Sequence, residues 1–456
     1  MSIIIPANSA VSGGFSVANS CMFNSADTAS LSKTPSSNGS NTVWTVSMWV
    51  KRAGTAAGKL HAAGTSSTYE FLFDDTNFGL TLYNGSATIF VTSRSLKDSS
   101  SWYHIVLAYN TGASGTDKVK LFINGVQETS FATDNRSSAG TMNHINQNVV
   151  QYVGRTHGGG LFNGYLAEVC IIDGTAYAAS DFGEFDEDSG IWVPKDVSGL
   201  TFGTNGFYLD FKVSGNLGND ANGGTDLTEN NIAATDQMID TCTNNFPTLN
   251  SLESSTVRGT NTYSQGNLQV LTPQGETGNT FSTVGVSSGK WYSEFYIKAN
   301  SGIERSLVGV SGDVGATLSV ANNVGSLSGA RDVGYMGNDG DKFVSGSESS
   351  YGGSAFSVGD VIGVALDLDN NTVNFAQNNS FKGTIAISST GTFHMGCGDV
   401  SGGARATIVA NYGQNSSFAG SITAANNADE HGEGLFKYSP PSGFITLNTK
   451  NLAEYG

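Results

Sequence analysis

Short apolar runs, separated by turn-forming residues, repeat along the whole chain. In residues 42–50, TVWTVSMWV, every second position is apolar, at Trp44, Val46, Met48 and Val50. Because side chains alternate between the two faces of a strand, this spacing predicts a half-buried strand. Similar runs predict strands at 70–73, 79–83, 88–92, 103–109, 119–123, 149–153 and 166–172.

Turn residues lie between these runs, and the pair Asn124-Gly125 is the strongest hairpin signal in the first half of the chain. It separates the segments KVKLFI and VQETSF. A type I′ turn needs positive φ at both central positions, which Asn followed by Gly tolerates well. The sequence therefore predicts antiparallel strands joined by tight turns.

The second half of the chain shows the same pattern after a region rich in Gly, Asn and Asp at 197–245. Strands are expected at 206–211, 266–270, 289–297, 307–311, 360–368 and 372–379, the first of them returning to the N-terminal domain. We predict an all-β chain of two tandem antiparallel β-sandwiches. Its parts are an N-terminal anchor at 1–14, a first domain at 15–212, a linker or crossover at 213–254 and a second domain at 255–456. Residues 240–246 fit a pinned crossover equally well.

The signature strands of the first half resemble a known family. Residues 44–52 (WTVSMWVKR), 102–106 (WYHIV), 119–125 (VKLFING) and 162–169 (FNGYLAEV) resemble successive strands of the laminin-G-like, concanavalin A-like jelly roll. The resemblance spans roughly residues 15 to 210. It implies a sandwich and suggests sugar or calcium binding, although this fold does not by itself specify a ligand.

The second half resembles a SPRY-like sandwich over about residues 255 to 425. The similarity lies in GKWYSE at 289–294, VGVS at 308–311 and the run that begins GDVIGVALDLD at 359–369. It implies an interaction module that binds through loops between strands. The closing segments 409–414 and 440–452 look like the end of this domain in virion proteins of tailed phages. The two domains in this order imply a virion appendage, a tail fibre or spike.

The composition and the net charge limit the kinds of partner that the protein is expected to bind. There are 59 glycines and only 13% charged residues, which favours many turns over long solvated helices. The net charge of −17 repels phosphate backbones and anionic membrane surfaces, so no nucleic-acid partner is expected. The absence of a long apolar run and of a signal-peptide pattern predicts a soluble chain without membrane insertion, made in the bacterial host cytoplasm. The four cysteines have no C-x-x-C spacing and are expected to be reduced, a single disulfide being the alternative.

Catalysis is not expected. Glycan hydrolases of the jelly-roll class use paired carboxylates, and the nearest cluster here, Glu184, Asp186 and Asp188, lies among turn residues. The six histidines include no close pair for zinc, and no G-x-S-x-G nucleophile elbow joins a strand to a helix. A glycan hydrolase or depolymerase stays as an alternative function.

No cofactor is expected, and calcium is the one plausible ion because loop carboxylates and carbonyls suit it. The candidates are Asp74, Asp75 and Asn77 in one loop, and Asn338, Asp339 and Asp341 in another. The competing interpretation is that these residues form Asx turns. Similarly, Tyr335, Phe343 and Tyr351 could stack on sugar rings or fill the core.

The region from Asn322 to Gly353 is long, polar and Gly-rich, and we predict that it forms an outward contact loop. Its candidate ligand-binding residues are Arg331, Tyr335, Asn338, Asp339, Asp341 and Tyr351. The expected partner is a host cell-surface glycan or protein. The apolar start, Ile3-Ile4-Ile5, is expected to attach to other virion proteins, and several copies, by preference a homotrimer, to provide avidity. The alternative is a purely architectural head or tail decoration protein.

Overall fold

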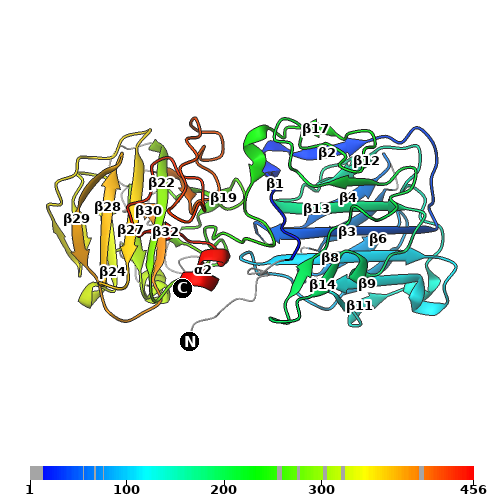
Figure 1. The fold of residues 1–456 in the computed structure, drawn as a ribbon, viewed down its shortest axis with the longest axis horizontal. Helices are drawn as coiled ribbons and strands as arrows, with labels where there is room; N and C mark the ends of the chain where they lie inside the picture. The colour runs from blue at the N-terminus through cyan, green and yellow to red at the C-terminus, as the bar shows by residue number, and fades with distance from the viewer. Residues whose placement is uncertain are drawn as a thin grey trace. The chain divides into compact units, whose positions relative to one another are not determined.

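A computed structural model describes residues 14–54, 56–65, 68–74, 77–253, 259–274, 278–300, 306–319, 324–399 and 405–456. The chain divides into two compact units, and among described residues the division falls between Asn245 and Phe246. Each unit is a sandwich of sheets whose described strand pairs are antiparallel, apart from one short parallel pair in the second unit, which confirms the predicted fold class (Figure 1).

The first domain consists of two eight-stranded sheets, here called the back sheet and the front sheet. The back sheet has the order β10-β9-β8-β3-β13-β1-β18, with β16 paired to β13. Its strands are β1 (Ser20–Phe23), β3 (Val43–Arg52), β8 (Trp102–Asn110), β9 (Val119–Ile123), β10 (Val126–Gln127), β13 (Gly164–Asp173), β16 (Phe207–Leu209) and β18 (Gln237–Met238).

The front sheet has the order β11-β7-β6-β5-β4-β12-β2-β17. Its strands are β2 (Ser30–Lys33), β4 (Gly58–Ala63), β5 (Tyr69–Phe73), β6 (Leu80–Tyr83), β7 (Thr88–Thr92), β11 (Phe131–Asp134), β12 (Gln151–Val153) and β17 (Thr228–Asn230). A separate hairpin joins β14 (Gly183–Phe185) and β15 (Trp192–Pro194). Short 3₁₀ turns lie at Ser25–Asp27, Gly115–Lys118, Arg136–Ser138, Ala179–Asp181 and Ala234–Asp236.

Strand β3 shows how the sequence pattern builds the core. Trp44, Val46, Met48 and Val50 point between the sheets and are fully buried. The prediction of a half-buried strand is wrong, because Trp49 on the opposite face is also buried. Apolar residues of the segments that follow β13 form a second cluster over that face of the back sheet. The Asn124-Gly125 turn has φ of 48° and 77° and joins β9 to β10, as a type I′ turn requires.

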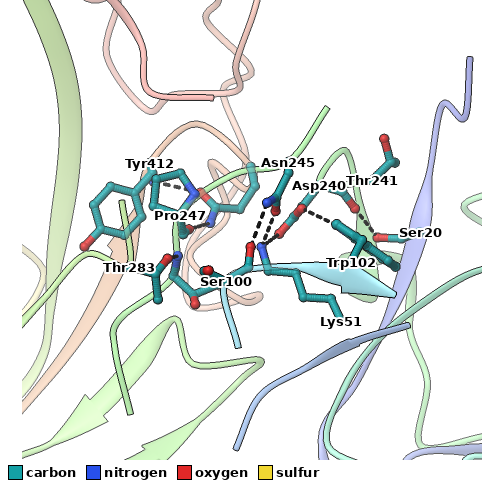
Figure 2. A network of polar contacts seen from close by, with 12 residues as sticks. Ser20, Lys51, Ser100, Trp102, Asp240, Thr241, Asn245, Pro247, Thr283 and Tyr412 are labelled. Atoms are coloured by element: carbon teal, nitrogen blue, oxygen red, sulfur yellow. Dashed lines mark hydrogen bonds and ion pairs between the residues drawn. The ribbon is translucent and has the colours of Figure 1, made fainter. Parts of the chain in front are cut away.

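The structure has no separate linker at 213–254 among its described residues. Strand β17 pairs with β2 and strand β18 with β1, so residues up to Asn245 complete the first domain. Figure 2 shows how the end of this segment is held: Lys51 Nζ lies 2.7 Å from Asp240 Oδ2 and 2.7 Å from Asn245 Oδ1. Gly-rich composition predicted an interruption here, but buried polar contacts order the segment.

The second domain packs an eight-stranded sheet, β19-β20-β31-β22-β27-β28-β29 with β32 beside β22, on the six-stranded sheet β21-β30-β23-β24-β25-β26. Its strands are β19 (Thr262–Ser264), β20 (Gln269–Leu271), β21 (Thr280–Phe281), β22 (Lys290–Asn300), β23 (Ser306–Ser311), β24 (Asp332–Met336), β25 (Lys342–Val344), β26 (Ser347–Ser349), β27 (Val361–Asp367), β28 (Thr372–Gln377), β29 (Ser380–Ala386), β30 (His394–Asp399), β31 (Ala406–Asn411) and β32 (Ile445–Thr446). The helices are α1 (Val314–Ser319), α2 (Thr449–Tyr455) and a 3₁₀ turn at Ser328–Ala330.

The predicted long loop from Asn322 to Gly353 is wrong for its described part. Strands β24, β25 and β26 form a meander at one edge of the six-stranded sheet. The glycines that suggested a loop allow close packing instead: a Cβ on Gly334 would lie 2.5 Å from the carbonyl oxygen of Val324 and 2.7 Å from Leu307 Cδ1. Gly in a strand often marks such a close approach.

Candidate functional site

The two tyrosines predicted to face outward are core residues. Tyr335 is 0% exposed and Tyr351 is 6% exposed. The Tyr335 ring lies 4.9 Å from that of Phe356 and 5.4 Å from that of Tyr351, in edge-to-face contacts. Burial removes both from any outward surface. Arg331 stays accessible but is ion-paired with Asp313 Oδ2 at 2.7 Å, so the three side chains do not form one patch.

Asn338, Asp339 and Asp341 do lie together, in the turn between β24 and β25. Carboxylate oxygens of Asp339, Asp341 and Glu348 all lie within 4.8 Å of one another. Glu348 was not predicted, and only the β25–β26 register, which brings it opposite Phe343, could have indicated it. The backbone N–H of Asp341 donates to Asp339 Oδ1 at 3.0 Å, which is an Asx turn. Calcium takes six to eight oxygen ligands, so these carboxylates would supply part of a site.

The described residues of the other candidate calcium site, Asp74 and Asn77, form hydrogen bonds within and beside their own loop. Asp75 lies outside the described residues. The backbone N–H of Asn77 donates to Asp74 Oδ1 at 3.3 Å. The Asn77 amide donates to the Thr92 carbonyl at 2.7 Å and accepts from the Gly79 N–H at 2.8 Å. The Asn77 side chain therefore holds the turn before β6.

The acidic cluster considered for hydrolysis lies on the β14–β15 hairpin and its turn. Glu184 is exposed and pairs with Lys195 at 3.1 Å. Hydrogen bonds from Ser189 hold the pKa of Asp186 below its usual value. A general acid in glycoside hydrolysis needs a raised pKa, and Asp186 has the opposite shift.

Ser47 and His104 form a buried pair in the first domain. Ser47 Oγ lies 3.0 Å from His104 Nε2, while Trp192 Nε1 donates to His104 Nδ1 at 2.9 Å. Because indole N–H only donates, Nδ1 carries no proton and the neutral ring holds its proton on Nε2. Burial lowers the pKa of His104 to about 3. His104 therefore donates to Ser47 and has no free nitrogen with which to activate that hydroxyl as a nucleophile.

The two sheets of the first domain differ in their outward faces. The outward face of the back sheet is covered by the cluster that includes Trp49, Trp102 and Trp192. Outward residues of the front sheet belong to none of the buried apolar clusters of the described chain. In the pairing of β12, β4, β5 and β6, one row across this face reads Tyr152, Ala62, Glu70 and Tyr83. We call this row, with Lys59, the front face.

The front face places an ion pair between two aromatic rings. Lys59 Nζ lies 2.7 Å from Glu70 Oε2, and both side chains are 17% exposed. Tyr83 and Tyr152 are partly exposed, on strands three spacings of about 4.8 Å apart. Arg155 lies over the Tyr152 ring, 5.7 Å from its centroid. The sequence did not predict this site. Alternation places each of these residues on a strand face, but only the order of the strands brings them into one row.

Two family comparisons agree with these folds. Residues 24–179 match the concanavalin A-like lectin/glucanases superfamily, and residues 277–416 match the SPRY domain. The chain contains a concanavalin A-like domain followed by a SPRY domain. Each match covers about a third of the chain, and no curated protein matches it.

Solved structures give weaker likenesses. The SPRY domain of human HERC1 is 21% identical, with a TM-score of 0.27, over 31% of this chain and 87% of that one. The TRIM65 PSpry domain is 14% identical, with a TM-score of 0.28, over 36% of this chain and 88% of that one. A putative carbohydrate binding protein from Bacteroides ovatus is 14% identical, with a TM-score of 0.33, over 47% of this chain and 59% of that one.

No helix in the described part of the chain is long and apolar enough to cross a membrane.

Proposed function

We propose that the protein binds a glycan through the front face of its concanavalin A-like domain, without catalysis. The observation that carries this proposal is the Lys59–Glu70 ion pair flanked by Tyr83 and Tyr152, on a sheet face that none of the apolar clusters of the described residues covers. Sugar rings have apolar C–H faces, which stack on aromatic rings, and hydroxyl groups, which charged groups bind strongly. An aromatic–charged–aromatic row matches both features.

The geometry favours an oligosaccharide over a single sugar. Tyr83 and Tyr152 stand on β6 and β12, separated by β5 and β4, so their strands are about 14 Å apart. Glu70 lies between them and Lys59 within reach of it. A ligand that contacts both rings must therefore extend across the strands.

The biological setting that we propose is the virion of a tailed bacteriophage, as a tail fibre or spike that binds a host-surface glycan. The order of the two domains and the pattern of the closing segments 409–414 and 440–452 support it. Single glycan sites are weak, so several copies, by preference a homotrimer, would gain avidity. The attachment segment 1–14 falls almost wholly outside the described residues.

The test is binding to immobilised bacterial polysaccharides by the whole protein and by the variants Tyr83→Ala, Tyr152→Ala and Glu70→Gln. Each variant should bind at least tenfold more weakly with its unfolding temperature nearly unchanged. The control is Tyr455→Ala, since Tyr455 is 42% exposed and belongs to the other domain. Unchanged polysaccharide binding by all three variants would refute the assignment of the face.

The architectural alternative, a decoration protein, has a separate test. It predicts that neighbouring subunits cover the front face in the particle. A particle reconstruction with Tyr83 and Tyr152 buried against another subunit would favour it.

A further inference from the structure

Several polar groups that face the core of the first domain have no partner among the residues that the structure describes. Trp44 Nε1, Tyr69 Oη and both ring nitrogens of His61 have no hydrogen-bond partner among the described residues. All three side chains are 0% exposed. Buried polar groups are nearly always bonded to protein or to ordered water, so this concentration requires a physical explanation.

These groups belong to one cluster of rings contributed by both sheets. Trp44 on the back sheet meets Tyr69 on the front sheet edge-to-face, with ring centroids 5.7 Å apart. His61 meets the same tyrosine with centroids 5.5 Å apart. The three side chains are therefore close enough for one or two small molecules to contact them together.

The strand register adds a fourth polar group, the side chain of Gln151. Ala63 pairs with Tyr69 on one side and with Gln151 on the other, so all three face the same side of the front sheet. Gln151 Nε2 donates to the carbonyls of His144 and Val149, while its Oε1 is buried without a partner in the described chain. The small side chain of Ala63 therefore lies between the longer polar side chains of Tyr69 and Gln151.

Donors and acceptors in this cluster complement one another. Trp44 can only donate and Gln151 Oε1 can only accept, whereas the Tyr69 hydroxyl does both. Burial lowers the pKa of His61 to about 3, so its neutral ring has one donor and one acceptor. Water supplies two donors and two acceptors, and buried waters usually make about three hydrogen bonds.

We propose that Trp44, His61, Tyr69 and Gln151 form an internal site that holds ordered water between the two sheets. The water joins the two sheets through hydrogen bonds. This site lies on the inner side of the front sheet and is independent of the proposed glycan face.

The decisive variant is Tyr69→Phe in the full-length protein, because the sign of its effect separates the possibilities. If water bonds the hydroxyl, its removal lowers the unfolding temperature of the first domain. If the hydroxyl is unbonded, its removal relieves a desolvation cost and leaves that temperature unchanged or raises it. Tyr109→Phe is the matched control, since the Tyr109 hydroxyl donates to the Gly140 carbonyl and its loss should be destabilising.

A high-resolution crystal structure provides the second measurement. We expect a water oxygen about 3 Å from both Tyr69 Oη and a ring nitrogen of Trp44 or His61. An unfolding temperature that is unchanged or raised in Tyr69→Phe would overturn the proposal. So would a crystal structure in which these side chains bond one another directly.

Discussion

Replacing Asp240 by Ala should destabilise the first domain more than any surface substitution. Asp240 forms an ion pair with Lys51 at 2.7 Å, and both side chains are 0% exposed. Trp102 Nε1 donates to Asp240 Oδ1 at 3.0 Å (Figure 2). The substitution would leave the Lys51 ammonium buried without its counter-charge, and burial already holds the pKa of Lys51 below its usual value.

The magnitude follows from the environment of the pair. Removing one partner of a buried ion pair costs about 3–5 kcal/mol, because the remaining charge loses its compensation. Replacing both residues, as Lys51→Met with Asp240→Leu, buries no charge and should recover most of that loss. The double variant should therefore be more stable than Asp240→Ala alone. If the two substitutions acted independently, their losses would add and the double variant would be the less stable of the two.

Urea unfolding followed by tryptophan fluorescence is the assay. Four of the five tryptophans, Trp44, Trp49, Trp102 and Trp192, lie in the first domain, so the signal reports mainly its unfolding. Glu184→Ala is the control, because its exposed pair with Lys195 should contribute less than about 1 kcal/mol. A loss below about 1 kcal/mol for Asp240→Ala, or a double variant less stable than the single one, would refute the reasoning.

Two further predictions concern the second domain. Burial raises the pKa of Glu294 to about 7, although the backbone N–H groups of Lys437 and Tyr438 donate to its carboxylate. Between about pH 4.5 and pH 7 this carboxyl group ionises in the unfolded chain before it ionises in the folded one, so the free energy of unfolding falls as the pH rises. In urea unfolding, the free energy of unfolding of the wild type should fall by up to about 3 kcal/mol over this pH range, and that of Glu294→Gln should fall less. The same fall in both proteins would contradict the prediction. Tyr335→Ala or Tyr351→Ala should each cost about 3–5 kcal/mol through the lost core packing of the second domain. Calorimetry, which records the unfolding of both domains, is the measurement, and a loss under about 1 kcal/mol would show that the ring cluster is not part of the core.

The strands were predictable from sequence because alternation and turn chemistry are local properties. The strand at 42–50 and the Asn124-Gly125 turn needed no tertiary information, and both form where expected, although the strand is buried on both faces and not on one. The extent of the first domain was not predictable in this way. Residues 228–230 pair with β2, about 200 positions earlier, and Asp240 is held by Lys51; neither contact leaves a periodic signal in a Gly-rich segment.

The candidate site was harder to predict for a related reason. Tyr335 and Tyr83 each stand beside small or polar residues, and composition cannot tell which tyrosine points inward. The fold decides: Tyr335 packs in the ring cluster of the second domain, whereas Tyr83 lies on an outward row. The acidic turn at 338–341 was found because Asn, Asp and Gly mark turns directly, but Glu348 joins it only through strand pairing.

The contrast between the two sheets of the first domain bears most directly on function. A sheet that needed only a core partner could leave either outward face to ordinary polar residues. Here the back sheet has a large apolar outward cluster, and the segments after β13 cover it. The front sheet instead combines the partly exposed Tyr83 and Tyr152 with a close Lys59–Glu70 pair, whose two side chains are each 17% exposed. These rings and this ion pair, on the face that none of the apolar clusters of the described residues covers, are the features that the proposed glycan site would use.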